Sequence, residues 1–153
     1  MATPKKTSEG NGPAKIDRAM VLSAGLGTRM RLPLLGDGPF FAINSDALWI
    51  DGPEPAMARM AQVWDPSRMD ALLLLHPTVT AVGYSRKGDF TMEPDGRLFR
   101  RQAWEIAPFL FTGVQILHPR LFEDEAPGKF SLNRLYDKAL AADRLFGIRH
   151  DGE

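Results

Sequence analysis

Short apolar runs, each closed by turn-forming residues, constrain most strongly what this chain of 153 residues can fold into. The runs at 19–22 and 69–76 are apolar almost throughout, which is typical of strands that are buried on both faces of a parallel sheet. Further strands are predicted at 40–43, 109–117 and 145–148, and helices are predicted over 54–64 and after the capping residue Ser131. Strands that alternate with helices predict an α/β fold with a mostly parallel sheet and flanking helices.

The residues from 83 to 101 have a different pattern. They are more polar and are centred on Pro94, Asp95 and Gly96, which form a turn signal. We interpret this segment as a β-hairpin of two short strands.

The balance of charge and the absence of cysteine exclude several classes of function. The 19 basic residues are matched by 19 acidic ones, so the sequence lacks the basic excess of a nucleic-acid-binding protein. The chain has no cysteine, which excludes disulfides, thiol nucleophiles and thiolate metal sites. The longest unbroken apolar run, 71–75, is far shorter than the ~20 residues of a membrane helix. We therefore expect a cytoplasmic protein without nucleic-acid or membrane partners, with a disordered leader over 1–17 and a single domain over 18–153.

A glycine-bearing turn follows the first predicted strand and is a candidate phosphate site. Gly25 and Gly27 carry no side chain that would keep a ligand away from the backbone N–H groups, and Arg29 and Arg31 can pair with phosphate oxygens. The alternative is a simple glycine turn with two solvated arginines. The segment is neither a dinucleotide-binding fingerprint nor a Walker A loop, because the third glycine of the first motif and the Gly-Lys-Ser/Thr of the second are absent.

A second candidate site follows the strand predicted at 40–43, where the chain continues as Asn44-Ser45-Asp46. A carboxylate at the carboxyl end of a buried strand faces the crevice in which open α/β sheets bind ligands. There it could hold Mg²⁺ while phosphate groups supply further oxygen ligands. The alternative for Asp46 is an Asx-turn or a helix cap, which is a common use of aspartate after a strand.

Together these motifs resemble those of a known enzyme family. The segment 22–30 is similar to the signature of the sugar-1-phosphate nucleotidyltransferases, also called nucleotide-diphosphate-sugar pyrophosphorylases. Residues 40–46 resemble the strand of that family that ends in a metal-binding aspartate, and 111–114 resemble a later strand whose glycine faces the sugar. Within the family, the likeness is to the type that acts on N-acetylmuramate 1-phosphate or mannose 1-phosphate.

The resemblance implies a Rossmann-like fold and the transfer of a nucleoside monophosphate from UTP or GTP to a sugar 1-phosphate, with Mg²⁺ as cofactor. It implies that Arg29 and Asp46 are catalytic, Asp46 as the metal ligand and Arg29 against the departing pyrophosphate. The implied nucleotide-binding residues are Leu22, Ala24, Gly25, Leu26, Gly27, Thr28 and Arg29. The implied sugar-binding residues are Asn44, Thr112 and Gly113.

The chain also departs from the family pattern. The family signature continues into Pro-Lys-Pro and further βα units, whereas here Arg31 runs directly into Leu32 and the segment that precedes the aspartate strand. The second metal carboxylate of the family lies beyond the position of Glu153. We therefore expect an incomplete domain, and the alternative function is a non-catalytic remnant or an interaction subunit with the same fold. Missing strands would leave an open sheet edge, which favours self-association into a homo-oligomer.

Overall fold

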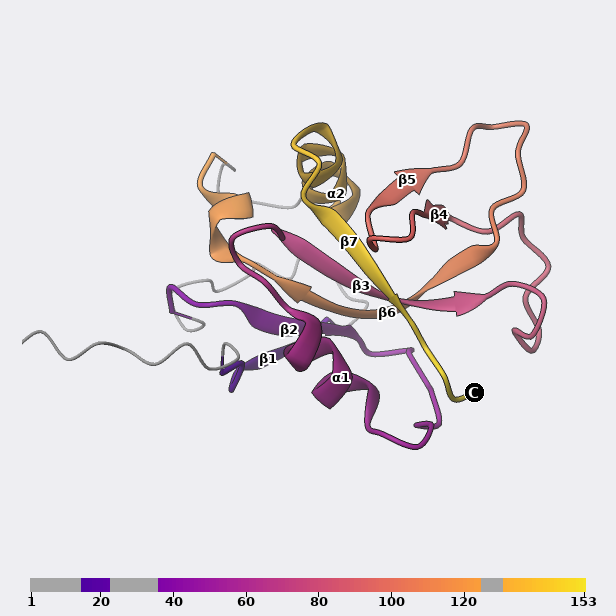
Figure 1. Ribbon diagram of the computed structural model, residues 1–153, viewed down its shortest axis with the longest axis horizontal. Helices are drawn as coiled ribbons and strands as arrows, with labels where there is room; N and C mark the ends of the chain where they lie inside the picture. Colours follow the sequence, from indigo (N-terminus) through magenta and orange to yellow (C-terminus); the bar gives the residue numbers. More distant parts are fainter. Residues whose placement is uncertain (1–14, 23–35, 125–130) are drawn as a thin grey trace, which may run out of the picture.

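The computed structural model describes residues 15–22, 36–124 and 131–153, which form a seven-stranded sheet with helices on both faces (Figure 1). The strands are β1 (Ala19–Leu22), β2 (Phe40–Asn44), β3 (Ala71–Pro77), β4 (Phe90–Met92), β5 (Leu98–Arg100), β6 (Phe109–Leu117) and β7 (Leu145–Arg149). The helices are α1 (Ala56–Val63), α2 (Leu132–Ala141) and the short 3₁₀ helix η2 (Pro119–Phe122). All predicted strands and helices are present, and η2 is the one additional helix among the described residues.

The α/β class is confirmed, but the sheet is mixed rather than mostly parallel. The strands follow the order β1-β2-β6-β3-β7, with the β4–β5 hairpin attached to β6. The β1–β2 and β3–β7 pairs are parallel, whereas β6 runs antiparallel to both β2 and β3. The prediction missed this reversal because the apolar pattern of a central strand is the same in either direction.

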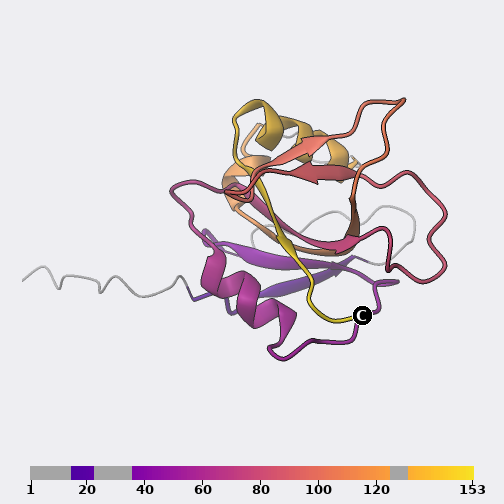
Figure 2. The same ribbon diagram turned by 45° about the vertical axis from the view of Figure 1, so that its right-hand side comes forward.

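The core lies in two layers, one on each face of the sheet, and alternate residues of the strands divide between them. In β3, Leu72 and Leu74 pack toward α1, while Leu73 and Leu75 pack toward α2, and all four side chains are fully buried. Figure 2 shows α1 and α2 on opposite faces of the sheet. The prediction that this strand is buried on both faces is therefore confirmed.

The two helices begin with different caps. The Ser131 hydroxyl accepts a hydrogen bond from the Asn133 N–H at 3.3 Å, as the sequence predicts for α2. Helix α1 begins at Ala56, after Pro55, and the carboxylate of Asp51 accepts from the Ala56 N–H at 2.9 Å. In the part of the chain that the structure describes, no helix has both the length and the apolar character that a membrane crossing requires.

A buried polar pair joins α2 to the sheet. The Tyr136 hydroxyl donates to Gln115 Oε1 at 2.7 Å, and both side chains are buried. Burial raises the pKa of the Tyr136 hydroxyl strongly, because the phenolate would lose its hydration. Tyr136 therefore stays protonated and acts as a hydrogen-bond donor inside the core.

At the end of the sheet opposite the carboxyl ends of β3 and β7, two arginines share one carboxylate. Asp70, which is 8% exposed, accepts hydrogen bonds at Oδ1 from Arg120 Nε and, at 2.7 Å, from Arg144 Nε. Both guanidinium groups also donate to carbonyl groups of the turn that precedes β3. This cluster joins η2, the α2–β7 turn and the turn that precedes β3.

His118, which caps η2, makes the unfolding free energy dependent on pH. Its Nδ1 accepts from the Arg120 N–H at 3.2 Å, and burial, followed by the positive charge of Arg120, lowers the pKa of its imidazole. The unfolded state therefore binds more protons than the folded state once the pH falls below the ordinary histidine value of ~6.5. The His118 contribution to stability is present above that value and is lost as the pH falls through the lowered pKa.

We expect His118→Asn, which keeps an acceptor for the Arg120 N–H but cannot titrate, to reduce this loss. The measurement is the free energy of unfolding in urea, at a series of pH values from about 7.5 to about 5. Wild type is expected to lose more stability than the variant over this range. Equal losses in both proteins would show that other groups cause the acid sensitivity.

Candidate functional site

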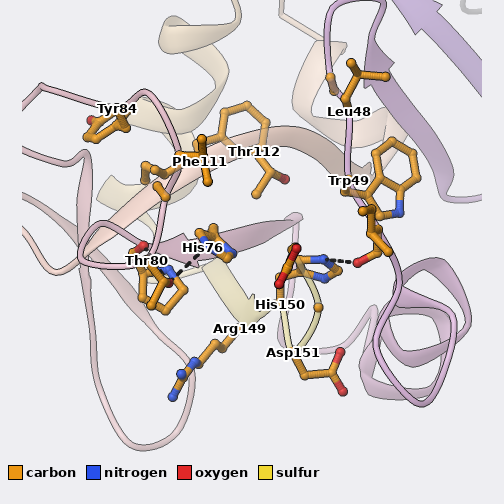
Figure 3. Close-up of a pocket in the computed structure, with 18 of the residues that line it drawn as sticks. Leu48, Trp49, His76, Thr80, Tyr84, Phe111, Thr112, Arg149, His150 and Asp151 are labelled. Carbon is orange, nitrogen blue, oxygen red and sulfur yellow. Dashed lines mark hydrogen bonds between the residues drawn. The ribbon is translucent and has the colours of Figure 1, made fainter.

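A cavity of about 950 Å³ opens where the carboxyl ends of β2, β3 and β7 meet (Figure 3). These three strands run in the same direction, because β2 and β3 are both antiparallel to β6 and β7 is parallel to β3. In open α/β sheets, this edge is where ligands bind. One wall is the β2–α1 loop from Asp46 to Asp51, and the facing wall is the β3–β4 loop from Thr80 to Tyr84.

The turn that carries Asp46 lies directly beside the end of β1. Leu22 is the register partner of Asn44, and the Ser45 N–H donates to the Leu22 carbonyl at 2.8 Å. The Ala47 N–H then closes the turn on the Asn44 carbonyl at 3.0 Å. Leu22, after which the glycine-bearing segment begins, and the predicted metal ligand Asp46 therefore lie at the ends of neighbouring strands.

The Asp46 side chain is exposed and lines the cavity. Among residues 15–22, 36–124 and 131–153, no hydrogen bond or ion pair engages its carboxylate. The cap of α1 is supplied instead by Asp51, whose Oδ1 also accepts from the Trp49 indole at 3.0 Å. Within the described residues, Asp46 therefore serves neither as an Asx-turn nor as a helix cap.

A bulge in β6 brings Thr112 and Gly113 to the same place. Residues 73 and 75 of β3 pair with 115 and 111 of β6, so β6 carries extra residues at this point. Thr112 Oγ1 donates to the Leu74 carbonyl at 2.9 Å, which satisfies a backbone group that the bulge removes from the ladder. Thr112 lines the cavity, and Gly113 adopts a positive φ of 90° against the Asn44 side chain.

Gly113→Ala is expected to destabilise the protein by more than a positive φ alone would cost. An added Cβ would lie 3.0 Å from both Cβ and Nδ2 of Asn44. The backbone strain costs ~1 kcal/mol, and the displacement of Asn44 adds to it. Gly83→Ala is the matched control, because Gly83 also has a positive φ, of 73°, but its Cβ would meet nothing within 4 Å. Urea unfolding of both variants gives the comparison, and an equal loss would mean that Asn44 yields without cost.

The cavity also contains residues that the sequence reasoning did not select, namely Trp49, His76, Tyr84, Arg149 and His150. His76 is in β3 and His150 directly follows β7, so each stands at a strand end as Asp46 does. Position at the end of an apolar run was the signal that could have found them.

The remaining predicted site residues lie outside the described part of the chain. They are Ala24, Gly25, Leu26, Gly27, Thr28 and Arg29. The phosphate site predicted on them therefore stays a prediction.

Comparison with known proteins tests the resemblance. No protein-family model matches the chain. The N-acetylmuramate alpha-1-phosphate uridylyltransferase of Caulobacter vibrioides is 37% identical to it over 136 residues, which are 89% of this chain and 56% of that protein. The predicted relationship to the sugar-1-phosphate nucleotidyltransferases is confirmed.

Solved structures of this family share the fold. The crystal structure of apo UDP-glucose pyrophosphorylase matches 79% of this chain with a TM-score of 0.60 at 20% identity. A putative glucose-1-phosphate thymidylyltransferase from Bacillus anthracis, solved in complex with sucrose, matches with a TM-score of 0.55 at 13% identity. The chain spans about half the length of these relatives, 50% of each solved chain and 56% of the Caulobacter protein.

Proposed function

We propose that this chain transfers a nucleoside monophosphate from UTP or GTP to a sugar 1-phosphate and releases pyrophosphate. The observation that carries the proposal is that described residues from three motifs of the family lie close together at neighbouring strand ends. Asp46 and Thr112 line the cavity, Leu22 is the register partner of Asn44, and Gly113 lies against the Asn44 side chain. A glycine turn that binds phosphates after β1 would lie within reach of a metal at Asp46 and of a sugar at Thr112.

The reaction that we propose does not require a general base. A phosphate monoester has its second pKa near ~6, so a sugar 1-phosphate is already mostly dianionic at neutral pH. One of its oxygens attacks the α-phosphorus, and the bond from that phosphorus to the oxygen that bridges to the β-phosphorus breaks as pyrophosphate leaves. The protein needs only to align the two substrates and to offset the charge of the crowded oxygens.

Asp46 is the residue that would hold Mg²⁺. Mg²⁺ commonly binds one or two carboxylates together with substrate phosphates and water, so the exposed carboxylate of Asp46 at the cavity fits an ion that arrives with the triphosphate. The described residues contain no group of three or more histidine or acidic side chains that could hold a metal without substrate. When bound, the ion would draw electron density from the phosphate oxygens and reduce repulsion of the incoming nucleophile.

The other roles are those that the family resemblance implies. We assign Arg29 to the departing pyrophosphate, and Leu22 and Ala24 to the base or ribose, with the N–H groups around Gly25 and Gly27 cradling the triphosphate. Leu26 and Thr28 complete the nucleotide contacts. Asn44, Thr112 and Gly113 would face the sugar.

The name of the Caulobacter relative indicates which substrate pair should be tested first. Its name specifies a uridylyltransferase that acts on N-acetylmuramate α-1-phosphate, so UTP with that sugar phosphate is the first combination to test. GTP with mannose 1-phosphate, and UTP or dTTP with glucose 1-phosphate, are the next. We expect release of pyrophosphate, measured by a coupled colorimetric assay with Mg²⁺, from at least one pair.

A second candidate function is a non-catalytic domain that binds nucleotides. It is favoured by the sequence after Arg31, which runs directly into Leu32 and lacks the Pro-Lys-Pro that the family resemblance leads us to expect there. Calorimetric binding of UTP or GTP in the presence of Mg²⁺, without pyrophosphate release from any pair, would select this candidate.

A further inference from the structure

Apolar side chains that are almost completely exposed lie on both walls of the cavity. Leu48, in the β2–α1 loop, is 98% exposed, and Val82, in the facing β3–β4 loop, is fully exposed. Both residues line the cavity. Single exposed apolar side chains are ordinary on a protein surface, but apolar residues gathered around one cavity are typical of a ligand site.

Two aromatic rings extend this apolar surface (Figure 3). Tyr84 comes from the β3–β4 loop and Phe111 from β6. The Phe111 ring packs edge-on against the Tyr136 ring, with centroids 5.9 Å apart and planes at 77°, so the core fixes its position. The Tyr84 hydroxyl accepts a hydrogen bond from the Gly88 N–H at 3.1 Å. Both rings are therefore held in place, and they offer a ligand mainly apolar surface.

Several polar side chains of the lining already have partners within the protein. His76 Nε2 forms a hydrogen bond with Thr80 Oγ1 at 3.1 Å. His150 Nε2 donates to the Ile50 carbonyl at 3.0 Å, because a carbonyl oxygen can only accept (Figure 3). Asp51 accepts hydrogen bonds from an indole N–H and from the first N–H of α1. A group that is already hydrogen-bonded gains little from a ligand, so contacts with a ligand beside these groups are mainly apolar.

The apolar surface is next to the residues that we assign to the metal and to the sugar. Phe111 directly precedes Thr112 in β6, and Leu48 follows Asp46 by two residues in the β2–α1 loop. A sugar 1-phosphate held between Asp46 and Thr112 would therefore present substituents of its ring to this surface. A hydroxyl group would lose hydration there without gaining a partner, whereas an alkyl or acyl group would gain from leaving water.

We propose that Leu48 and Val82, with the rings of Tyr84 and Phe111, form an acyl subsite in the cavity. This acyl subsite selects sugars that carry an N-acetyl or similar apolar substituent over unsubstituted hexoses. The inference rests on the function proposed above, because it concerns the substrate of the same site. It gives these residues a role in specificity and none in the chemical step.

The test compares the binding of UDP-N-acetylglucosamine with that of UDP-glucose, measured by isothermal titration calorimetry on the whole chain with Mg²⁺. These two nucleotide sugars differ in one substituent of the sugar ring, an acetamido group in the first and a hydroxyl in the second. No pyrophosphate is added, so binding is measured without turnover. In wild type, we expect UDP-N-acetylglucosamine to bind about five- to tenfold more tightly, as burial of its methyl group predicts.

Leu48→Ser and Val82→Ser are each expected to reduce this ratio of affinities about threefold, by weakening the binding of the acetylated compound. Since both side chains are exposed, the variants should fold as wild type does, which the midpoint of thermal unfolding checks. Val79→Ser is the matched control, because Val79 is 90% exposed and lies in the same loop as Val82 but does not line the cavity. It should leave the ratio unchanged, as should Leu48→Met, which keeps an apolar side chain.

Failure of the acyl subsite and failure of the proposed function give different results. Equal affinities of wild type for the two nucleotide sugars would overturn the acyl subsite and leave the transferase proposal standing. So would a ratio that is unchanged in both cavity variants, or one that falls equally in Val79→Ser. Binding of neither compound would contradict the uridylyl form of the proposed function, and the acyl subsite with it.

Discussion

Asp46→Asn is expected to lower the rate of pyrophosphate release at least about 100-fold, the effect of removing one charge-stabilising group from a preorganised site. The substitution keeps the shape of the side chain and removes the negative charge that would hold Mg²⁺. Because the Asp46 carboxylate has no partner among the described residues, the fold should not suffer. The measurements are the initial rate with UTP and N-acetylmuramate 1-phosphate and the midpoint of thermal unfolding.

The matched control for Asp46→Asn is Glu93→Gln, which removes the same charge from the β4–β5 hairpin, away from the cavity. The Glu93 side chain is exposed, and no hydrogen bond or ion pair of it is found among the described residues. We expect this variant to keep the wild-type rate. Equal rates in wild type and Asp46→Asn would remove Asp46 from the reaction, whereas equal losses in both variants would indicate an effect of net charge alone.

The strands and helices could be predicted because local sequence decides them. Ser131 caps α2 with its own hydroxyl, and the turn at Pro94 to Gly96 closes the β4–β5 hairpin, so each signal acts within a few residues. The order of the strands depends on contacts between distant residues. Nothing in the run from Phe109 to Leu117 indicates that it enters the sheet between β2 and β3 in the opposite direction.

The first strand shows that apolar composition alone does not predict the burial of a strand. The run 19–22 is apolar and was predicted to be buried, but in the structure Val21 is 62% exposed and Ala19 is exposed as well. Strand β1 is the terminal strand in the sheet order and pairs only with β2 among the described residues. Apolar character shows that a strand belongs to a sheet, whereas its burial depends on which elements cover it.

Candidate site residues could be predicted where a single short motif contains them. Asn44 and Asp46 were found from the end of a strand, and the structure sets them beside Leu22 and Gly113. The histidines were missed because their partners are distant in sequence. The His150 side chain forms a hydrogen bond with the carbonyl of Ile50, 100 residues earlier in the sequence. The parallel pairing of β3 with β7 brings His76 close to His150.

Asp70→Ala is expected to lower the free energy of unfolding by about 3 kcal/mol, as expected when one partner is removed from a buried ion pair. Two guanidinium groups would lose the charge that they share, and Asp70 is only 8% exposed. The arginine side chains are 33% and 26% exposed, so water offsets part of the loss and the effect should stay at the lower end of its range. Urea unfolding at neutral pH measures the change.

The comparison that tests this explanation is Asp137→Ala, which breaks the ion pair of Asp137 with Arg100 on the surface. That pair also has a short distance, 2.8 Å, but Asp137 is 63% exposed, so we expect a loss below ~1 kcal/mol. If burial decides the strength of the Asp70 cluster, Asp70→Ala must unfold at clearly lower urea than Asp137→Ala. Similar urea midpoints for the two variants would mean that the carbonyl groups around Arg120 and Arg144 hold these side chains without the carboxylate of Asp70. The cluster would then stabilise the turn before β3 through hydrogen bonds rather than through charge.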